Sequence, residues 1–195
     1  MKKFFIALAI LFCVTGNVNA APFTDNQFNK IFTDITKNPA LENSATFGVN
    51  VETFKEKFNA SAEPILKEIT GLDDLSAMAH LFLIYDYKVF NLNGVDVFAN
   101  TFGNKSVSVV GVTAPDGGNF KVLQCCYTTA EEQDDLFVTQ MVLTAFVRSI
   151  APDVEVPTLM GELTAENSSG TVTKGDVTFS VAEDGNLNVL TAVVK

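Results

Sequence analysis

One segment, residues 129–152, constrains the fold of this chain more than any other. It opens with Thr-Ala-Glu-Glu, which is typical of a helix capping box, and then stays mostly apolar as far as Pro152. Its polar side chains form only a narrow strip at a spacing of four: Gln140, Thr144 and Arg148. A helix that is apolar on nearly every side belongs in the centre of a protein, and Thr139 beside Gln140 argues against a membrane span. We therefore predict that this segment is the core helix and that it runs to Ile150.

The preceding region, residues 80–127, changes to a two-residue alternation that is typical of strands. Asn93-Gly94 accepts the positive φ values of a type I′ turn and predicts a tight hairpin. Further turn sequences follow at 103–104 and 115–118. Three consecutive short connections imply a four-stranded antiparallel meander. Its expected strands are 81–91, 95–102, 106–114 and 120–127.

Both faces of this sheet carry apolar side chains. In strand 95–102, Phe98 and Phe102 point away from Val97. The last strand alternates in the same way, with Val122 and Cys126 opposite Leu123, Cys125 and Tyr127. A sheet with one face in water would alternate more cleanly, so we expect something to cover the second face. A helix of the same chain is the favoured cover, and a partner subunit or a ligand are the alternatives.

Two helices are expected before the sheet. Thr24 begins a capping-box sequence for a helix that ends near Lys37, and Asn38-Pro39 then leads into a loop over residues 40–44. The second helix should begin after Asn50 and end near Glu63, because Pro64 removes a backbone donor.

The C-terminal part is expected to contribute one short helix and a hairpin. The helical piece covers 159–165, and a loop follows at 167–170. The hairpin joins strands 177–182 and 187–194 through the turn sequence Glu-Asp-Gly-Asn. The fold class that follows is α+β, with an antiparallel sheet of about six strands packed against helices.

A short repeated pattern raises the question of internal duplication. Phe58-x-x-Ser61-x-x-Pro64 recurs as Phe146-x-x-Ser149-x-x-Pro152, and in both places an amphipathic helix is expected to end. Each half would then be a helix followed by antiparallel strands, a weak α-β duplication. Two helices that each stop at a proline for ordinary reasons are the simpler explanation.

The first twenty residues resemble an export signal rather than part of the domain. Two lysines precede an apolar run over residues 4–14, and the segment ends in Val-Asn-Ala. The run is too short to span a bilayer. Cys13 raises the alternative of a lipoprotein anchor, but Phe12 stands where a small residue is expected. We predict a cleaved signal peptide at 1–20, a single domain at 21–195, and a bacterial protein that is periplasmic or secreted.

The charge balance disfavours polyanionic partners. The formal net charge is −10 at pH 7, which repels phosphate backbones and anionic lipid. We therefore expect neither nucleic-acid binding nor insertion into a membrane once the signal is removed. Arg148 is the chain's single arginine, so it is the one side chain that could bind a phosphate or carboxylate through two parallel guanidinium hydrogen bonds, and such recognition is disfavoured.

Cysteine and histidine are too scarce for a zinc or iron site. The chain has one His, and outside the signal its cysteines are the adjacent Cys125 and Cys126. Neighbours on a strand point to opposite faces, so we expect no disulfide between them and interpret them as two small buried hydrophobes. A redox-active pair, or an intermolecular bridge through an exposed thiol, is the alternative. We assign no metal or other cofactor, since no sequence for a calcium or nucleotide loop is present either.

His80 is the chain's only imidazole and so the only base for a serine hydrolase of the common type. It stands at the start of an expected strand, where a structural role is favoured, and no G-x-S-x-G nucleophile sequence accompanies it. Paired acidic residues also occur, but in loops and at helix starts, where the helix dipole explains them.

The function expected from the sequence is therefore non-enzymatic. We expect an exported protein that binds a protein partner or a small apolar ligand. The alternatives are a secreted hydrolase that uses His80 or a carboxylate pair, and a structural homodimer. No catalytic, cofactor, metal or disulfide residue is assigned. The weak candidates for a site are His80, Arg148, Cys125 and Cys126.

Overall fold

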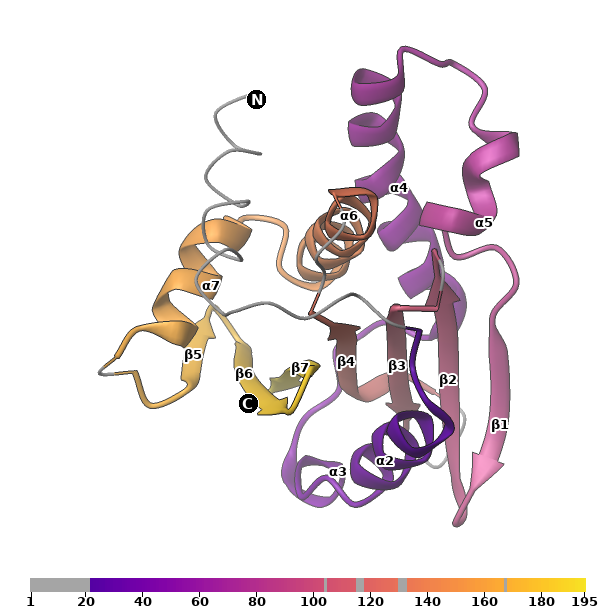
Figure 1. Cartoon of the computed structure of the whole chain (residues 1–195). Helices are drawn as coiled ribbons and strands as arrows, with labels where there is room; N and C mark the ends of the chain where they lie inside the picture. Colours follow the sequence, from indigo (N-terminus) through magenta and orange to yellow (C-terminus); the bar gives the residue numbers. More distant parts are fainter. Residues whose placement is uncertain (1–21, 104, 115–117, 130–132, 167) are drawn as a thin grey trace.

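A computed structural model of the chain describes residues 22–103, 105–114, 118–129, 133–166 and 168–195. The signal peptide expected at 1–20 lies outside these ranges. Residues 130–132 of the capping box expected at the start of the core helix lie outside them as well. The described residues form one seven-stranded antiparallel sheet. Helices α4, α6 and α7 lie on one face of it, and α2 and α3 lie on the other (Figure 1). The α+β class is confirmed, with one more strand than expected.

The strand order is β1-β2-β3-β4-β7-β6-β5. The expected four-stranded meander is confirmed, and Asn93 and Gly94 both have positive φ, as a type I′ turn requires. The C-terminal hairpin is also confirmed, and its last strand, β7, pairs with β4 in the middle of the sheet. The strands are β1 (Lys88–Leu92), β2 (Val95–Phe102), β3 (Val107–Thr113), β4 (Phe120–Thr128), β5 (Thr171–Lys174), β6 (Val177–Asp184) and β7 (Leu187–Val194).

The strand that was not expected is β5, a four-residue edge strand paired with β6. It is too short for its alternation to stand out from the neighbouring loop. Gly175, which has a φ of 59°, allows the tight turn that returns the chain into β6.

The helices are α2 (Asp25–Thr36), α3 (Ala40–Asn43), α4 (Val51–Thr70), the 3₁₀ turn η1 (Ser76–Met78), α5 (Ala79–Phe82), α6 (Gln133–Ile150) and α7 (Val156–Thr164). The capping box at Thr24 is confirmed, and Asn50 caps α4 through Thr53. The loop expected over 40–44 is wrong in part, because Ala40–Asn43 form the short helix α3. Pro39 precedes this helix, and the fixed φ of proline is tolerated at a helix start.

The expected end of the second helix is also wrong, since α4 continues through Pro64 to Thr70. Buried side chains lie on both sides of the proline, with Phe58 and Ala62 before it and Leu66 after it. An interior proline costs about 3 kcal/mol, and burial of this continuous apolar face offsets that cost. The helix ends instead at Gly71, which adopts the left-handed conformation.

The strand expected over 81–91 is wrong over most of its length. Residues 79–82 form α5, and regular pairing begins only at Lys88. Phe82, Leu83 and Ile84 are buried in succession, but Phe82 lies in α5 and none of the three pairs with a strand. The side chain of Asn59 in α4 bonds both backbone polar groups of Ile84, so these groups are not available to a neighbouring strand. His80 is consequently on a short helix and not on a strand.

The core has one part on each face of the sheet. Phe98, Phe102, Leu123, Cys125 and Tyr127 belong to the cluster that includes α4 and α6. Val97, Val122 and Cys126 belong to the cluster that includes Ile31 and Ile35 of α2. The opposite orientations expected in β2 and β4 are confirmed, and a helix of the same chain covers the second face.

The chain halves share an order of elements, α4 followed by β1–β4 and α6 followed by β5–β7. The repeated prolines differ, however, because Pro64 lies inside α4 whereas Pro152 follows the end of α6. The repeated Phe-x-x-Ser-x-x-Pro pattern therefore does not mark the end of both helices. Internal duplication stays a prediction.

Candidate ligand site at the end of helix α6

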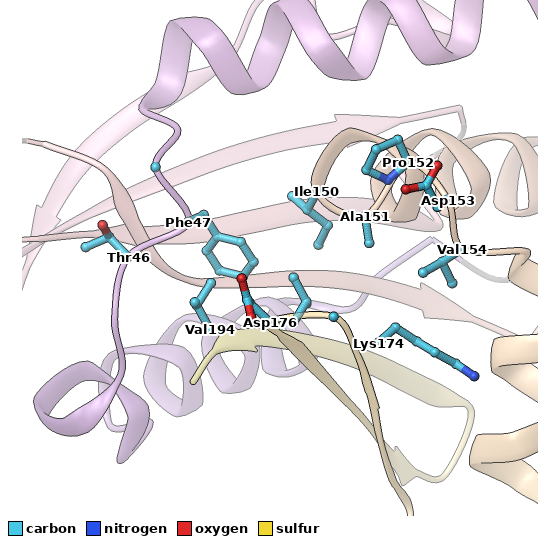
Figure 2. A pocket seen from close by; sticks show the side chains of 13 residues that line it. Thr46, Phe47, Ile150, Ala151, Pro152, Asp153, Val154, Lys174, Asp176 and Val194 are labelled. Carbon is cyan, nitrogen blue, oxygen red and sulfur yellow. The ribbon is translucent and has the colours of Figure 1, made fainter.

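A cavity of about 600 Å³ lies where α6 ends. Its walls come from four segments that are distant in the sequence, and Figure 2 shows them around the cavity. These segments are the linker before α4 (46–48), the chain after α6 (150–154), the β5–β6 turn (174–177) and Val194 of β7.

Backbone hydrogen bonds hold three of these walls in place. Phe47 N donates to Phe120 O at 2.9 Å, and Phe120 N donates to Val49 O at 2.8 Å, so the linker runs along the start of β4. Ala45 forms an isolated antiparallel bridge with Val194, and Lys195 N donates to Asp176 O at 3.1 Å. The cavity is thus built on a bonded backbone frame and does not depend on side chains alone.

Most of the lining is apolar. The apolar side chains are Phe47, Ile150, Ala151, Pro152, Val154, Val177 and Val194. The charged ones are Asp153 and Asp176, both exposed, and Lys174. Lys174 Nζ lies 2.8 and 2.6 Å from the two carboxylate oxygens of Glu162, so its charge is already balanced. The lining therefore favours an apolar ligand group.

A second cavity, of about 320 Å³, lies beside the first and shares Phe47, Ile150 and Pro152 with it as lining residues. We call the two together the α6 groove. The second cavity adds the basic side chains of Lys57 and Arg148, from α4 and α6 respectively. It also contains Ser61 and Ser149, the serines of the repeated pattern.

Arg148 is half-buried at this end of the groove. No hydrogen bond or ion pair joins its guanidinium to any residue that the structure describes. The hydroxyls beside it are already engaged as donors, Ser61 Oγ to Lys57 O at 2.8 Å and Ser149 Oγ to Phe146 O at 2.6 Å. The guanidinium donors are therefore available to a ligand or to water.

A further cavity, of about 440 Å³, lies on the other face of the sheet between α2 and strands β6 and β7. Lys30 in its lining already has acidic partners, because its Nζ lies 3.0 Å from Asp34 Oδ2 and 3.7 Å from Asp184 Oδ2. Asp34, chiefly through its hydrogen bond to the ammonium, raises the pKa of Lys30. This cavity offers a ligand no unpaired half-buried charge comparable to Arg148.

The other weak candidates lie away from the groove. His80 is exposed on α5, and no hydrogen bond joins it to a serine or threonine hydroxyl in the described part of the chain. Cys125 and Cys126 are both free and fully buried, on opposite faces of β4. Burial raises the pKa of both thiols well above the ordinary value, which opposes thiolate chemistry.

Sequence reasoning singled out Arg148 but missed Lys57, Phe47 and Pro152 as groove residues. Lys57 falls on the polar face of an amphipathic helix, where a lysine is ordinarily expected to be exposed to solvent and to have no binding role. The proline and the linker residue carry no local signal, because the groove exists only once the four segments meet.

No group of three or more His, Cys, Asp or Glu side chains gathers among the described residues in a way that could hold a metal ion. Among the described helices, none combines the length and the apolar character needed to cross a bilayer.

Comparison with known proteins gave no match: no family model, no curated protein and no solved structure is significantly similar to this chain.

Proposed function

We propose that this chain is an exported, non-enzymatic protein that binds a small apolar ligand in the α6 groove. The observation that carries the proposal is the groove itself, two adjoining cavities of about 600 and 320 Å³ with largely apolar walls. Ligand sites in proteins are typically concave, mostly apolar and about 300–1,000 Å³ in volume, with a few polar groups that fix orientation. Export rests on the signal-like sequence at 1–20.

The backbone frame around Phe47 supports binding without large rearrangement. The linker is tied to Phe120, and the end of β7 is tied to Ala45 and to the β5–β6 turn. A site whose walls are already ordered loses less conformational entropy when a ligand enters. No observation on the described residues favours the hydrolase alternative, since His80 lies on α5, outside the lining of the groove.

A tryptophan reporter tests the proposal directly, because the chain contains no tryptophan. Phe47→Trp places a single indole in the groove. Phe28→Trp is the matched control, since Phe28 is also half-buried but packs with the α2 cluster on the opposite face. The probe is 1-octanol, an uncharged molecule with an eight-carbon chain.

We expect 1-octanol to change the emission of Phe47→Trp saturably and to leave that of Phe28→Trp unchanged. Equal responses of the two variants would indicate non-specific partitioning and would contradict the proposal. A solution mass of twice the chain, with no response from Phe47→Trp, would instead favour the structural homodimer.

A further inference from the structure

We infer that the natural ligand of the α6 groove is an apolar carboxylic acid whose carboxylate is bound by Arg148 and Lys57. This inference rests on the proposed function and adds the chemical class of the ligand. The inference is drawn from the charged side chains of the groove, which differ between its smaller and its larger cavity.

Arg148 has no bonding partner among the described residues. Its guanidinium carries five N–H donors in a planar fork, and none of them bonds to a described residue although the side chain is half-buried. No nitrogen of this guanidinium is cut off from solvent, so an anion that enters the smaller cavity can reach these donors. A carboxylate matches the fork with two parallel hydrogen bonds. Occupation by a carboxylate would therefore satisfy the group that the chain leaves without a partner.

The charge of the smaller cavity is opposite in sign to that of the chain as a whole. The whole chain has a formal net charge of −10, yet the described lining of the smaller cavity contains Lys57 and Arg148 and no acidic side chain. Both acidic residues of the groove, Asp153 and Asp176, line the larger cavity instead. Repulsion from these two carboxylates disfavours the reverse orientation, with the ligand's carboxylate in the larger cavity.

Apolar side chains adjoin the basic side chains. Phe47, Ile150 and Pro152 line both cavities, so apolar surface borders the smaller, basic cavity as well as the larger one. A carboxylate at Arg148 can thus extend its hydrocarbon part along this surface. The apolar side chains beside the two cations favour an anion that carries a hydrocarbon chain over inorganic phosphate, which has none.

The test compares octanoate with 1-octanol, which differ in the charged head but share the chain length. Calorimetric titrations use the protein without residues 1–20, as the wild type and as Arg148→Met, Lys57→Met and Arg148→Lys. Lys67→Met is the matched control, because Lys67 is an exposed lysine of the same helix α4 that lines neither cavity. Thermal unfolding of each variant checks that it is folded.

We expect the wild type to bind octanoate more tightly than 1-octanol. Arg148→Met should weaken octanoate binding about 10- to 100-fold, the range for loss of a hydrogen bond to a charged group. Lys57→Met should weaken it less, and Arg148→Lys should retain part of the affinity because it keeps the charge. In Arg148→Met and Lys57→Met the affinity for 1-octanol should fall less than the affinity for octanoate, and Lys67→Met should match the wild type for both molecules.

Three results overturn the inference, and they can be told apart. If 1-octanol and octanoate bind equally well and Arg148→Met changes neither, the carboxylate assignment is wrong while the ligand-binding function stands. If neither molecule binds, the proposed function fails and the inference fails with it. Binding of inorganic phosphate as tight as that of octanoate would also overturn the inference, because the apolar tail would then contribute nothing.

Discussion

The side chain of Asn59 hydrogen-bonds to both backbone polar groups of Ile84, across 25 positions of sequence. Asn59 Oδ1 accepts from Ile84 N at 2.8 Å, and Asn59 Nδ2 donates to Ile84 O at 3.1 Å. This pair attaches the loop between α5 and β1 to the middle of α4. It also engages the backbone groups of Ile84, four residues before regular pairing begins at Lys88.

Replacing Asn59 with alanine should therefore destabilise the fold. Ile84 is fully buried, so its N–H and C=O would lose their partners without free access to water. We expect Asn59→Ala to lower the free energy of unfolding by about 1–3 kcal/mol, measured by urea titration. Glu56→Ala, at an exposed position of the same helix, should change it by less than about 0.5 kcal/mol. Equal effects at both sites would show that the Asn59 bonds do not contribute.

Two glycines should respond in opposite ways to the same substitution. A Cβ on Gly111 in β3 would come within 2.6 Å of the Phe120 ring and 2.8 Å of Leu123, inside a close-packed core. Gly111→Ala should cost about 1–3 kcal/mol of stability by overpacking. Gly161 in α7 has open space around its Cβ position, so Gly161→Ala should stabilise by about 0.5–1 kcal/mol through helix propensity. Thermal melts of the two variants measure both effects, and stabilisation by Gly111→Ala would contradict the packing described for β3.

Much of the fold can be predicted from the sequence wherever the signal is local. Asn93-Gly94 marks its hairpin, and Thr24 marks the start of α2, because turn and cap chemistry depend on a few adjacent residues. The opposite orientations of Phe98 and Val97 follow from strand geometry alone. These features need no knowledge of the rest of the molecule.

The features that could not be predicted depend on contacts between distant segments. The passage of α4 through Pro64 depends on what its buried face meets, and the loop at Ile84 depends on Asn59. The candidate site is the clearest case. Arg148 could be noticed as the single arginine, but only the meeting of the linker at Phe47 with the end of α6 places it in a groove.

Pro64 itself gives a further prediction. Pro64→Ala should restore a backbone donor in the middle of α4, and Pro64 is exposed, so the change removes little packing. We expect the free energy of unfolding to rise by about 1–2 kcal/mol, less than the full cost of an interior proline because the unfolded chain also gains freedom. Chemical denaturation of this variant beside the wild type measures the change. A loss of stability would mean that the proline contributes a contact of its own.

The buried thiols of Cys125 and Cys126 should make the fold less stable at alkaline pH. Burial raises their pKa from an ordinary value near 9, so above that pH the unfolded chain loses thiol protons that the folded chain keeps. The stability linked to each thiol is complete below pH 9 and is lost as the pH rises further, by up to about 1.4 kcal/mol per pH unit.

Urea titrations between pH 8 and 10 measure this slope. The double variant Cys125→Ala, Cys126→Ala is the comparison, because it removes both ionisable groups while keeping small apolar side chains. We expect a shallower decline of stability with pH in the double variant. Parallel pH curves for the two proteins would show that the thiols are not the source.

Native mass spectrometry of residues 21–195 tests the central claim most directly, because it reports the subunit number and any bound small molecule together. We expect a monomer that retains one small molecule from the producing cells or takes up one octanoate when it is added. A dimer, or a monomer that stays unliganded in excess octanoate, would contradict the account.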